Sequence, residues 1–213
     1  MISKIIDKYP YVSFDVFDTL LERKCLIPEN IFYKTGENIL GQGEMFQKLR
    51  QEAQKKAYAK FGQKTTLNCI YSQISEFNNE VLEELKKEEI KQEIYNCYPK
   101  AKIFKNYQYA LNENKHILII SDMYLSSTVI SKMLNKAGYS DFDKLYVSNE
   151  YGDGKKSGKL FQDALKEQNI SPCNLIHIGD SIRADILGSR KVGVKSIFVP
   201  KKKLLVRKIK YGL

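Results

Sequence analysis

The sequence predicts an α/β fold, a doubly wound parallel sheet with an inserted helical segment. Near the N-terminus and throughout the second half, short apolar runs bounded by turn residues alternate with amphipathic segments. That alternation is typical of parallel β-strands joined by helical crossovers. Residues 26–98 break the alternation, because only helical patterns occur there. Hydrophobic and charged contents of 43% and 28% are ordinary values for a globular protein.

Each predicted strand is a short apolar run. The five ranges are about 11–17, 116–121, 144–148, 174–179 and 195–199. Apolar residues at helical spacing predict helices between them, and Ser126 begins a Ser-Ser-Thr sequence suited to an N-terminal cap. These helices cover about 100–114, 126–137, 158–168 and 181–191.

The segment between the first strand and the next core helix is expected to be entirely helical. Its predicted helices cover about 28–40, opened by Pro28, and 44–61, 66–78 and 80–97. An insertion at this point would close over the carboxyl ends of the strands, exclude water and select the substrate. The charge run over 86–93 is interpreted as a solvated helix face without chemistry.

Polar residues end or follow several of the apolar runs. Asp15 ends the first, Ser121 ends the second, and Asp180 and Asp185 follow the fourth, while Lys155 lies in a glycine-rich loop. In an open parallel sheet, ligands bind beyond the carboxyl ends of the strands. A carboxylate, a hydroxyl, a lysine and a carboxylate pair meet the needs of Mg²⁺-assisted phosphoryl transfer through an aspartyl intermediate.

These motifs, in this order, resemble the haloacid dehalogenase (HAD) superfamily. The stretches 13–23, 121–126 and 155–161 are similar to a subgroup of predicted hydrolases associated with bacterial surface-polysaccharide synthesis. The resemblance implies a HAD-like core and a C1-type cap. The core is expected over 1–24 and 99–200, the cap over 25–98, and a basic tail over 201–213.

The resemblance also implies a role for each site residue. Asp15 is the expected nucleophile, and Ser121 and Lys155 would hold the phosphoryl oxygens. Lys156 competes for the lysine role, but the distance from Lys155 to Gly158 and Phe161 matches the superfamily spacing better. The expected Mg²⁺ ligands are Asp15, Asp180 and the backbone carbonyl of Phe17, with Asp185 orienting metal waters or pairing with the lysine.

One position departs from the superfamily pattern. Most superfamily phosphatases carry a second aspartate two residues after the nucleophile as the general acid/base, and here that residue is Phe17. Asp18 is the nearest candidate acid, although it is equally well explained as a turn residue. Two alternative functions follow: a dehalogenase, which also has an aromatic residue there, and a catalytically weak binding module.

The remaining composition limits location and partners. The net charge is +10, from 35 basic and 25 acidic residues, and six of the basic residues lie in the last 14 positions. That tail is expected to be solvated or to contact an anionic surface. Scattered cysteines argue against zinc, and the lack of a long apolar run or signal-peptide pattern predicts a cytoplasmic protein. No nucleic-acid partner is expected, and oligomeric state is not predicted. Candidate substrate contacts, each better explained by packing or a solvated surface, are Tyr33, Arg50 and Tyr124.

Overall fold

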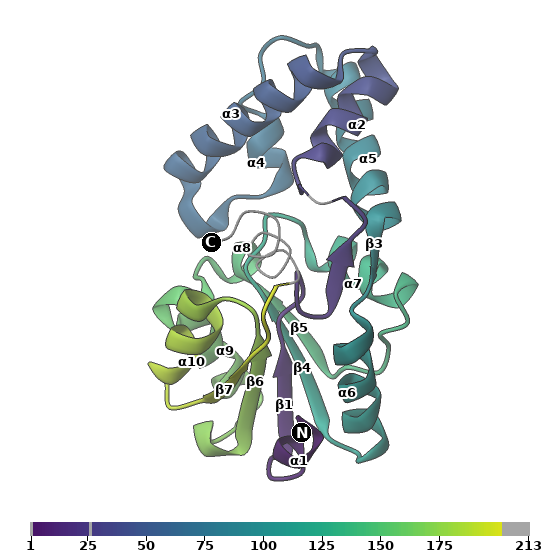
Figure 1. Ribbon diagram of the computed structural model, residues 1–213. Helices are drawn as coiled ribbons and strands as arrows, with labels where there is room; N and C mark the ends of the chain where they lie inside the picture. Colours follow the sequence, from purple (N-terminus) through teal and green to yellow (C-terminus); the bar gives the residue numbers. More distant parts are fainter. Residues whose placement is uncertain (1, 26, 202–213) are drawn as a thin grey trace, which may run out of the picture.

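The computed structural model describes residues 2–25 and 27–201. Its centre is a five-stranded parallel sheet in the order β5-β4-β1-β6-β7. The strands are β1 (Tyr11–Phe14), β4 (His116–Ser121), β5 (Lys144–Val147), β6 (Leu175–Gly179) and β7 (Lys195–Phe198). The predicted α/β class is confirmed, and the first strand lies in the middle of the sheet (Figure 1).

Both faces of the sheet are buried, as expected for a parallel sheet with helical crossovers. Phe14 and Ile119 belong to the hydrophobic cluster on one face, and Leu118 and Ile120 belong to a second cluster with Phe161. The core helices are α6 (Ala101–Asn112), α7 (Ser127–Lys136) and α9 (Lys159–Glu167). Short helices at other positions are α1 (Ser3–Ile6), α8 (Ser148–Tyr151), η2 (Lys155–Ser157) and η3 (Pro172–Asn174).

The helix predicted over 181–191 differs from a regular α-helix. It begins as a π-helix, η4 (Ile182–Leu187), and ends in the short α10 (Gly188–Arg190). The Ser181 carbonyl accepts from the N–H groups of both Asp185 and Ile186, at 2.8 and 3.2 Å. In return, the Ser181 N–H donates to Asp185 Oδ2 at 2.7 Å. Because this first turn of the helix is wider, the Asp185 side chain points back toward the end of β6.

Four helices form the inserted segment at the end of the molecule away from the N-terminus (Figure 1). They are α2 (Asn30–Leu40), α3 (Gly43–Phe61), α4 (Leu67–Tyr71) and α5 (Asn79–Asn96), with the short η1 (Gly62–Lys64) after α3. The predicted helix 66–78 is too long. Ser72 Oγ and Gln73 Nε2 both donate to the Cys69 carbonyl, which ends α4 early because that oxygen no longer serves a continuing helix.

A two-stranded antiparallel ribbon joins this segment to the core. It pairs β2 (Leu21–Arg23) with β3 (Cys97–Pro99), and Leu21 lies opposite Pro99. The prediction that residues 26–98 contain no strand is therefore wrong at Cys97 and Tyr98. Three residues are too few to show an alternating pattern. The strand forms through its pairing with β2, and that partner is too remote in sequence to be recognised from the local pattern.

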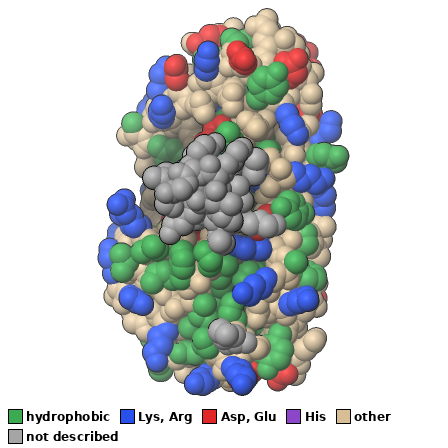
Figure 2. Space-filling model, in the orientation of Figure 1, with side chains coloured by type: hydrophobic (Ala, Val, Ile, Leu, Met, Phe, Trp, Pro, Cys, Tyr) green, Lys and Arg blue, Asp and Glu red, His purple; other side chains and the backbone are tan. Residues whose placement is uncertain are grey.

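The described surface is mixed in character. Lys and Arg side chains are spread over both ends of the molecule, and hydrophobic side chains gather on one side of the core (Figure 2). Exposed apolar residues near the β7 edge of the sheet include Ile182, Leu187 and Phe198. Within residues 2–25 and 27–201, no helix has the length and apolar character needed to cross a membrane.

Candidate active site

Asp15 lies directly after the central strand, between the ends of both neighbouring strands. Phe14 is in register with Ile119 of β4 and Ile178 of β6, and the Asp15 N–H donates to the Ile178 carbonyl at 2.9 Å. This register brings the residues after β1, β4 and β6 to one edge of the sheet. Sequence-distant polar residues therefore meet around Asp15.

Lys155 bridges two of the predicted carboxylates. Its Nζ lies 2.5 Å from Asp15 Oδ1 and 2.5 Å from Asp185 Oδ1, and all three residues are buried. Burial alone would lower the pKa of Lys155, but Asp15 and Asp185 raise it above its usual range. The lysine is therefore a fixed cation in the site. Lys156, the competing candidate, is exposed.

Asp185 is held in place by two further groups. His177 Nε2 lies 3.2 Å from Asp185 Oδ1, and His177 Nδ1 lies 2.8 Å from Ser13 Oγ. Burial lowers the pKa of His177, so the ring is neutral and its Nε2–H donates to the carboxylate. Burial alone would raise the pKa of Asp185, but Lys155 and His177 hold it well below its usual range. Sequence reasoning missed His177, which lies in a strand without a recognisable motif.

The approach of these elements requires two glycines. A side chain at Gly179 would collide with the Asp185 side chain, and one at Gly188 would collide with the Lys155 carbonyl. The turn carrying Asp185 can thus pack directly against the end of β6, and the loop carrying Lys155 can pack against α10.

Asp180 faces the end of the described chain. Lys201 Nζ lies 2.7 Å from Asp180 Oδ2 and 3.1 Å from Asp18 Oδ2. Thr19 Oγ1 also lies 3.5 Å from Asp180 Oδ1. The first residue of the predicted tail is therefore in contact with the site, and the tail's other residues lie outside the described part of the chain.

Ser121 and Asp122 follow one another at the end of β4. Ser121 is 1% exposed, and its Oγ has no hydrogen-bond partner among the described residues. A buried hydroxyl without a partner is costly, so its position suits a ligand oxygen. The Asp122 carboxylate accepts the backbone N–H of Lys155 at 2.9 Å and 3.2 Å through its two oxygens.

The residues present fit a Mg²⁺ ion. One oxygen from each of Asp15, Asp180 and Asp185 lies within 4.8 Å of the others, and carboxylate oxygens are the ligands that Mg²⁺ prefers. Burial raises the pKa of Asp15 well above its usual range, Lys155 opposes this, and the Asp185 and Asp180 charges reinforce it. The three carboxylates outnumber Lys155 and Lys201, the two lysines that contact them, and a bound cation would relieve the mutual repulsion that raises the pKa of Asp15.

The turn after β1 is closed by hydrogen bonds on either side of Phe17, the predicted backbone ligand. The carbonyls of Asp15 and Val16 accept from Leu20 and Leu21, and the Leu21 carbonyl accepts from Asp18. None of these three bonds uses the Phe17 carbonyl. Asp18 closes this turn with a φ of 61°, a left-handed conformation that aspartate tolerates better than most residues.

A cavity of about 430 Å³ lies between the helical cap and the core beside this site. Phe17, Asp122 and Tyr124 line it from the core, and Phe32, Gln51 and Lys55 are among the residues that line it from the cap. Its walls combine aromatic rings with amide and charged groups. Such a cavity suits a small polar molecule whose reactive group points toward Asp15.

A buried ion pair joins two cap helices next to this cavity. Arg50 of α3 binds Glu89 of α5 through two hydrogen bonds of 2.8 and 2.7 Å, and both side chains are fully buried. Glu89 also accepts from the hydroxyls of Tyr71 at 2.9 Å and Tyr124 at 3.4 Å. The prediction that 86–93 is a solvated face is wrong for the buried Glu89 and Glu93, because their partners Arg50 and Arg23 are remote in sequence. Arg50 is buried core, as expected.

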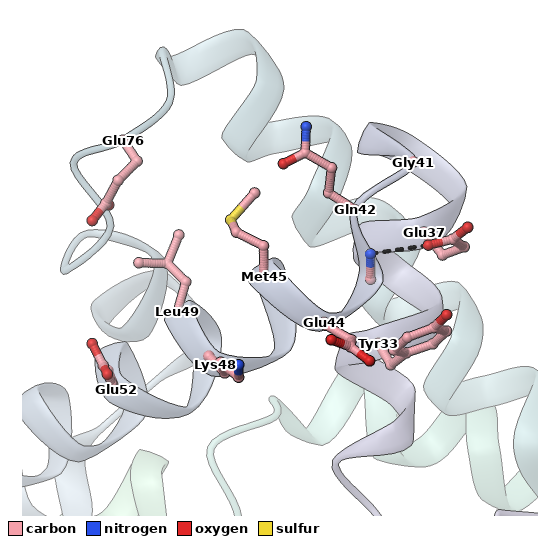
Figure 3. A pocket seen from close by; sticks show the side chains of 11 residues that line it. Tyr33, Glu37, Gly41, Gln42, Glu44, Met45, Lys48, Leu49, Glu52 and Glu76 are labelled. Carbon is pink, nitrogen blue, oxygen red and sulfur yellow. Dashed lines mark hydrogen bonds between the residues drawn. The ribbon is translucent and has the colours of Figure 1, made fainter.

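A larger cavity of about 770 Å³ lies at the far end of the cap (Figure 3). Tyr33 lines it together with Met45, Leu49 and several glutamates. Glu37 Oε2 accepts the Gly43 N–H at 3.0 Å. None of the residues around Asp15 lines this cavity, so Tyr33 is placed away from the candidate site.

Comparison with known proteins identifies the family. A family model described as haloacid dehalogenase-like hydrolase matches residues 13–199, and the chain belongs to this family. The structure is similar to that of the HAD-type protein YfnB of Bacillus subtilis bound to magnesium, with a TM-score of 0.65 and 19% identity over 97% of this chain and 100% of the other. An L-2-haloacid dehalogenase from Xanthobacter autotrophicus gives 0.65 and 14%, over 96% and 83%. The predicted HAD resemblance is thereby confirmed.

Matches to curated proteins are shorter. A glyceraldehyde 3-phosphate phosphatase of Pyrococcus furiosus is 35% identical over 57 residues, which is 27% of this chain and 24% of that protein. The corresponding phosphatase of Methanothermobacter thermautotrophicus is 28% identical over 68 residues, which is 32% of this chain and 30% of that protein. The matched stretches thus span less than a third of either relative.

Proposed function

We propose that this protein is a Mg²⁺-dependent phosphomonoesterase that works through an aspartyl-phosphate intermediate. The observation that carries the proposal is the buried cluster around Asp15, with Asp180, Asp185 and Lys155 in place and the Ser121 hydroxyl without a partner. Three carboxylates with one lysine suit a site that binds a divalent cation together with an anionic group.

In the proposed reaction, an Asp15 carboxylate oxygen attacks phosphorus, and the bond from phosphorus to the leaving oxygen breaks. Lys155 and Ser121 hold the phosphoryl oxygens and stabilise the charge that develops on them. Mg²⁺, held by Asp15, Asp180 and the Phe17 carbonyl, would offset the charge of the phosphoryl group. His177 and Lys155 keep Asp185 ionised and oriented toward the metal site. Water then hydrolyses the aspartyl-phosphate and restores Asp15.

The proposed substrate is a small phosphorylated metabolite, a sugar phosphate or a phosphorylated sugar-nucleotide conjugate. The mixed polar lining and the size of the cavity beside Asp15 support this class. Glyceraldehyde 3-phosphate belongs among the compounds to test, because two relatives are phosphatases for it. The sequence resemblance leads us to propose a role in surface-polysaccharide synthesis in the cytoplasm.

A dehalogenase is the second candidate, favoured by Phe17, whose ring lines the cavity and stacks under the Arg23 guanidinium at 4.4 Å. A dehalogenase does not require the divalent cation that the Asp15–Asp180–Asp185 cluster suits. A catalytically weak binding module is the third candidate. Beryllium fluoride, which mimics an aspartyl-phosphate, would bind to a module with a competent Asp15, but no substrate would be hydrolysed.

The test is phosphate release from a panel of phosphorylated metabolites. We expect activity with Mg²⁺, loss of activity in EDTA, and a loss of several orders of magnitude in Asp15→Asn. Asp153→Asn is the matched control, because Asp153 is a partly exposed carboxylate that pairs with Lys159. Metal-independent turnover would overturn the mechanism, and halide release from 2-haloacids would instead establish the dehalogenase.

A further inference from the structure

We infer that Asp122 is the general acid and base of this site, the role that Phe17 leaves open. This inference rests on the proposed function. Asp122 contacts both the phosphoryl site and the cavity. It follows Ser121 directly, its carboxylate accepts the Lys155 N–H, and it lines the cavity between cap and core. A substrate with its phosphoryl group at Asp15 and its remainder in that cavity would place the leaving oxygen between these two regions.

The position of the Asp122 carboxylate is fixed by its surroundings. The backbone N–H of Lys155 lies 2.9 Å from Oδ1 and 3.2 Å from Oδ2. Gly154 allows this contact, since a Cβ there would lie 3.3 Å from Asp122 Oδ1. The residue is only partly buried, so substrate can reach it. A proton donor held in place at the edge of a binding cavity is what general acid catalysis requires.

Asp18 is less well placed for this role. Its carboxylate pairs with Lys201 at 3.1 Å, and its carbonyl accepts from Lys100 Nζ at 2.7 Å. Asp18 also does not line the cavity. Among the cavity's other carboxylates, Glu93 is bound to Arg23 at 3.1 Å and Glu29 belongs to the cap. Asp122 is therefore the carboxylate that the core itself presents to the leaving group.

The electrostatic surroundings are consistent with a proton that can be donated. Burial raises the pKa of Asp122, and the Asp185 charge reinforces this, while the Lys155 charge and N–H and His177 oppose it. Burial, the larger cause, raises the pKa of Tyr58 of the cap, and the Asp122 charge in turn raises it further. A raised pKa keeps a larger fraction of Asp122 protonated near neutral pH than an ordinary aspartate would have.

The proposed proton transfers balance over the two steps. As Asp15 attacks, the bond from phosphorus to the leaving oxygen breaks, and that oxygen keeps the electron pair and takes the proton of Asp122. The alcohol leaves, and Asp122 is now a carboxylate. It then takes a proton from the attacking water, the bond from phosphorus to Asp15 breaks, and its electron pair returns to Asp15. Phosphate is released with Asp122 protonated again.

The test compares two substrates whose leaving groups differ in their need for a proton. Glyceraldehyde 3-phosphate has an alkyl leaving group that needs one, whereas p-nitrophenyl phosphate has an acidic phenol that does not. Asp122→Asn should lower kcat/KM, which reports the step that expels the leaving group, by roughly 10²- to 10⁴-fold on the alkyl substrate and by less than about 10-fold on the aryl substrate. The Asn Oδ1 still accepts the Lys155 N–H, so the loop contact is preserved.

The possible results distinguish the role of Asp122 from the proposed phosphatase activity itself. Equal losses on both substrates, or no loss on either, would overturn the role of Asp122 while leaving the phosphatase proposal intact. If wild-type protein with Mg²⁺ released phosphate from neither compound, the proposed function itself would fail for small phosphomonoesters. As a second readout, the decline of wild-type kcat/KM with rising pH on the alkyl substrate should disappear in Asp122→Asn. Persistence of that decline would also contradict the inference.

Discussion

Removal of one member of the buried Arg50–Glu89 pair should strongly destabilise the cap. Arg50→Met removes a guanidinium that makes two short bonds to Glu89, a 3.0 Å bond to Gln54, and a stacking contact of 4.4 Å with Phe32. Among the described residues, Glu89 then keeps the hydroxyls of Tyr71 and Tyr124 as its hydrogen-bond donors. Breaking one side of such a pair costs about 3–5 kcal/mol of unfolding free energy.

The assay is urea unfolding followed by far-UV circular dichroism and by tyrosine fluorescence. The chain has 14 tyrosines and no tryptophan, and Tyr71 and Tyr124 report on this site directly because they contact Glu89. For a chain of this size, the loss corresponds to a decrease of roughly 10 °C in Tm. Lys91→Met is the control, because Lys91 is exposed and its pair with Glu88 should contribute less than about 1 kcal/mol.

A double-mutant cycle decides whether the effect belongs to the pair. Arg50→Met with Glu89→Met replaces both charges by apolar groups, so we expect it to recover at least about 2 kcal/mol relative to the sum of the single losses. A loss below about 1 kcal/mol in Arg50→Met, or strictly additive losses in the double variant, would refute the reasoning.

Three further predictions concern Lys201, Asp18 and Phe17 near the site. Lys201→Ala removes a cation from Asp180 and should lower the half-saturating Mg²⁺ concentration roughly two- to five-fold, the effect of a partly exposed ion pair; thermal shift with and without Mg²⁺ measures this without turnover, and an unchanged or higher value would contradict it. Asp18→Asn should cut turnover of alkyl phosphates by roughly 10²- to 10⁴-fold if Asp18 is the acid, and should be nearly silent if Asp122 is; kcat on glyceraldehyde 3-phosphate decides between them. Phe17→Asp tests in the same assay whether a restored aspartate raises the rate.

The sheet could be predicted from the sequence because its strands are short, apolar and well delimited. The range predicted for β4, 116–121, agrees with the structure, and those of the other strands agree within three residues. Asp15, Ser121 and Lys155 could likewise be placed together, because the carboxyl ends of parallel strands share one edge. The predicted roles of these residues await the experiments above.

The parts that could not be predicted depend on partners remote in sequence. Glu89 looks like a surface residue until Arg50 is brought against it, and β2 forms only because β3 lies beside it. His177 carries no motif, and its importance follows from its contact with Asp185. Asp122 could have drawn notice as a second polar residue after a buried strand, but nothing in the sequence shows that it faces the cavity.

The chain enters and leaves the cap through one paired ribbon, β2 and β3. Its entry and exit strands are paired, with Arg23 opposite Cys97 and the Lys24 N–H donating to the Asn96 carbonyl at 2.9 Å. A tight two-residue turn could connect paired strands at such a point, so residues 24–96 could be exchanged without cutting the sheet or moving Asp15. The proposed specificity element can thus be replaced as one segment, while the residues of the proposed phosphoryl site stay in place.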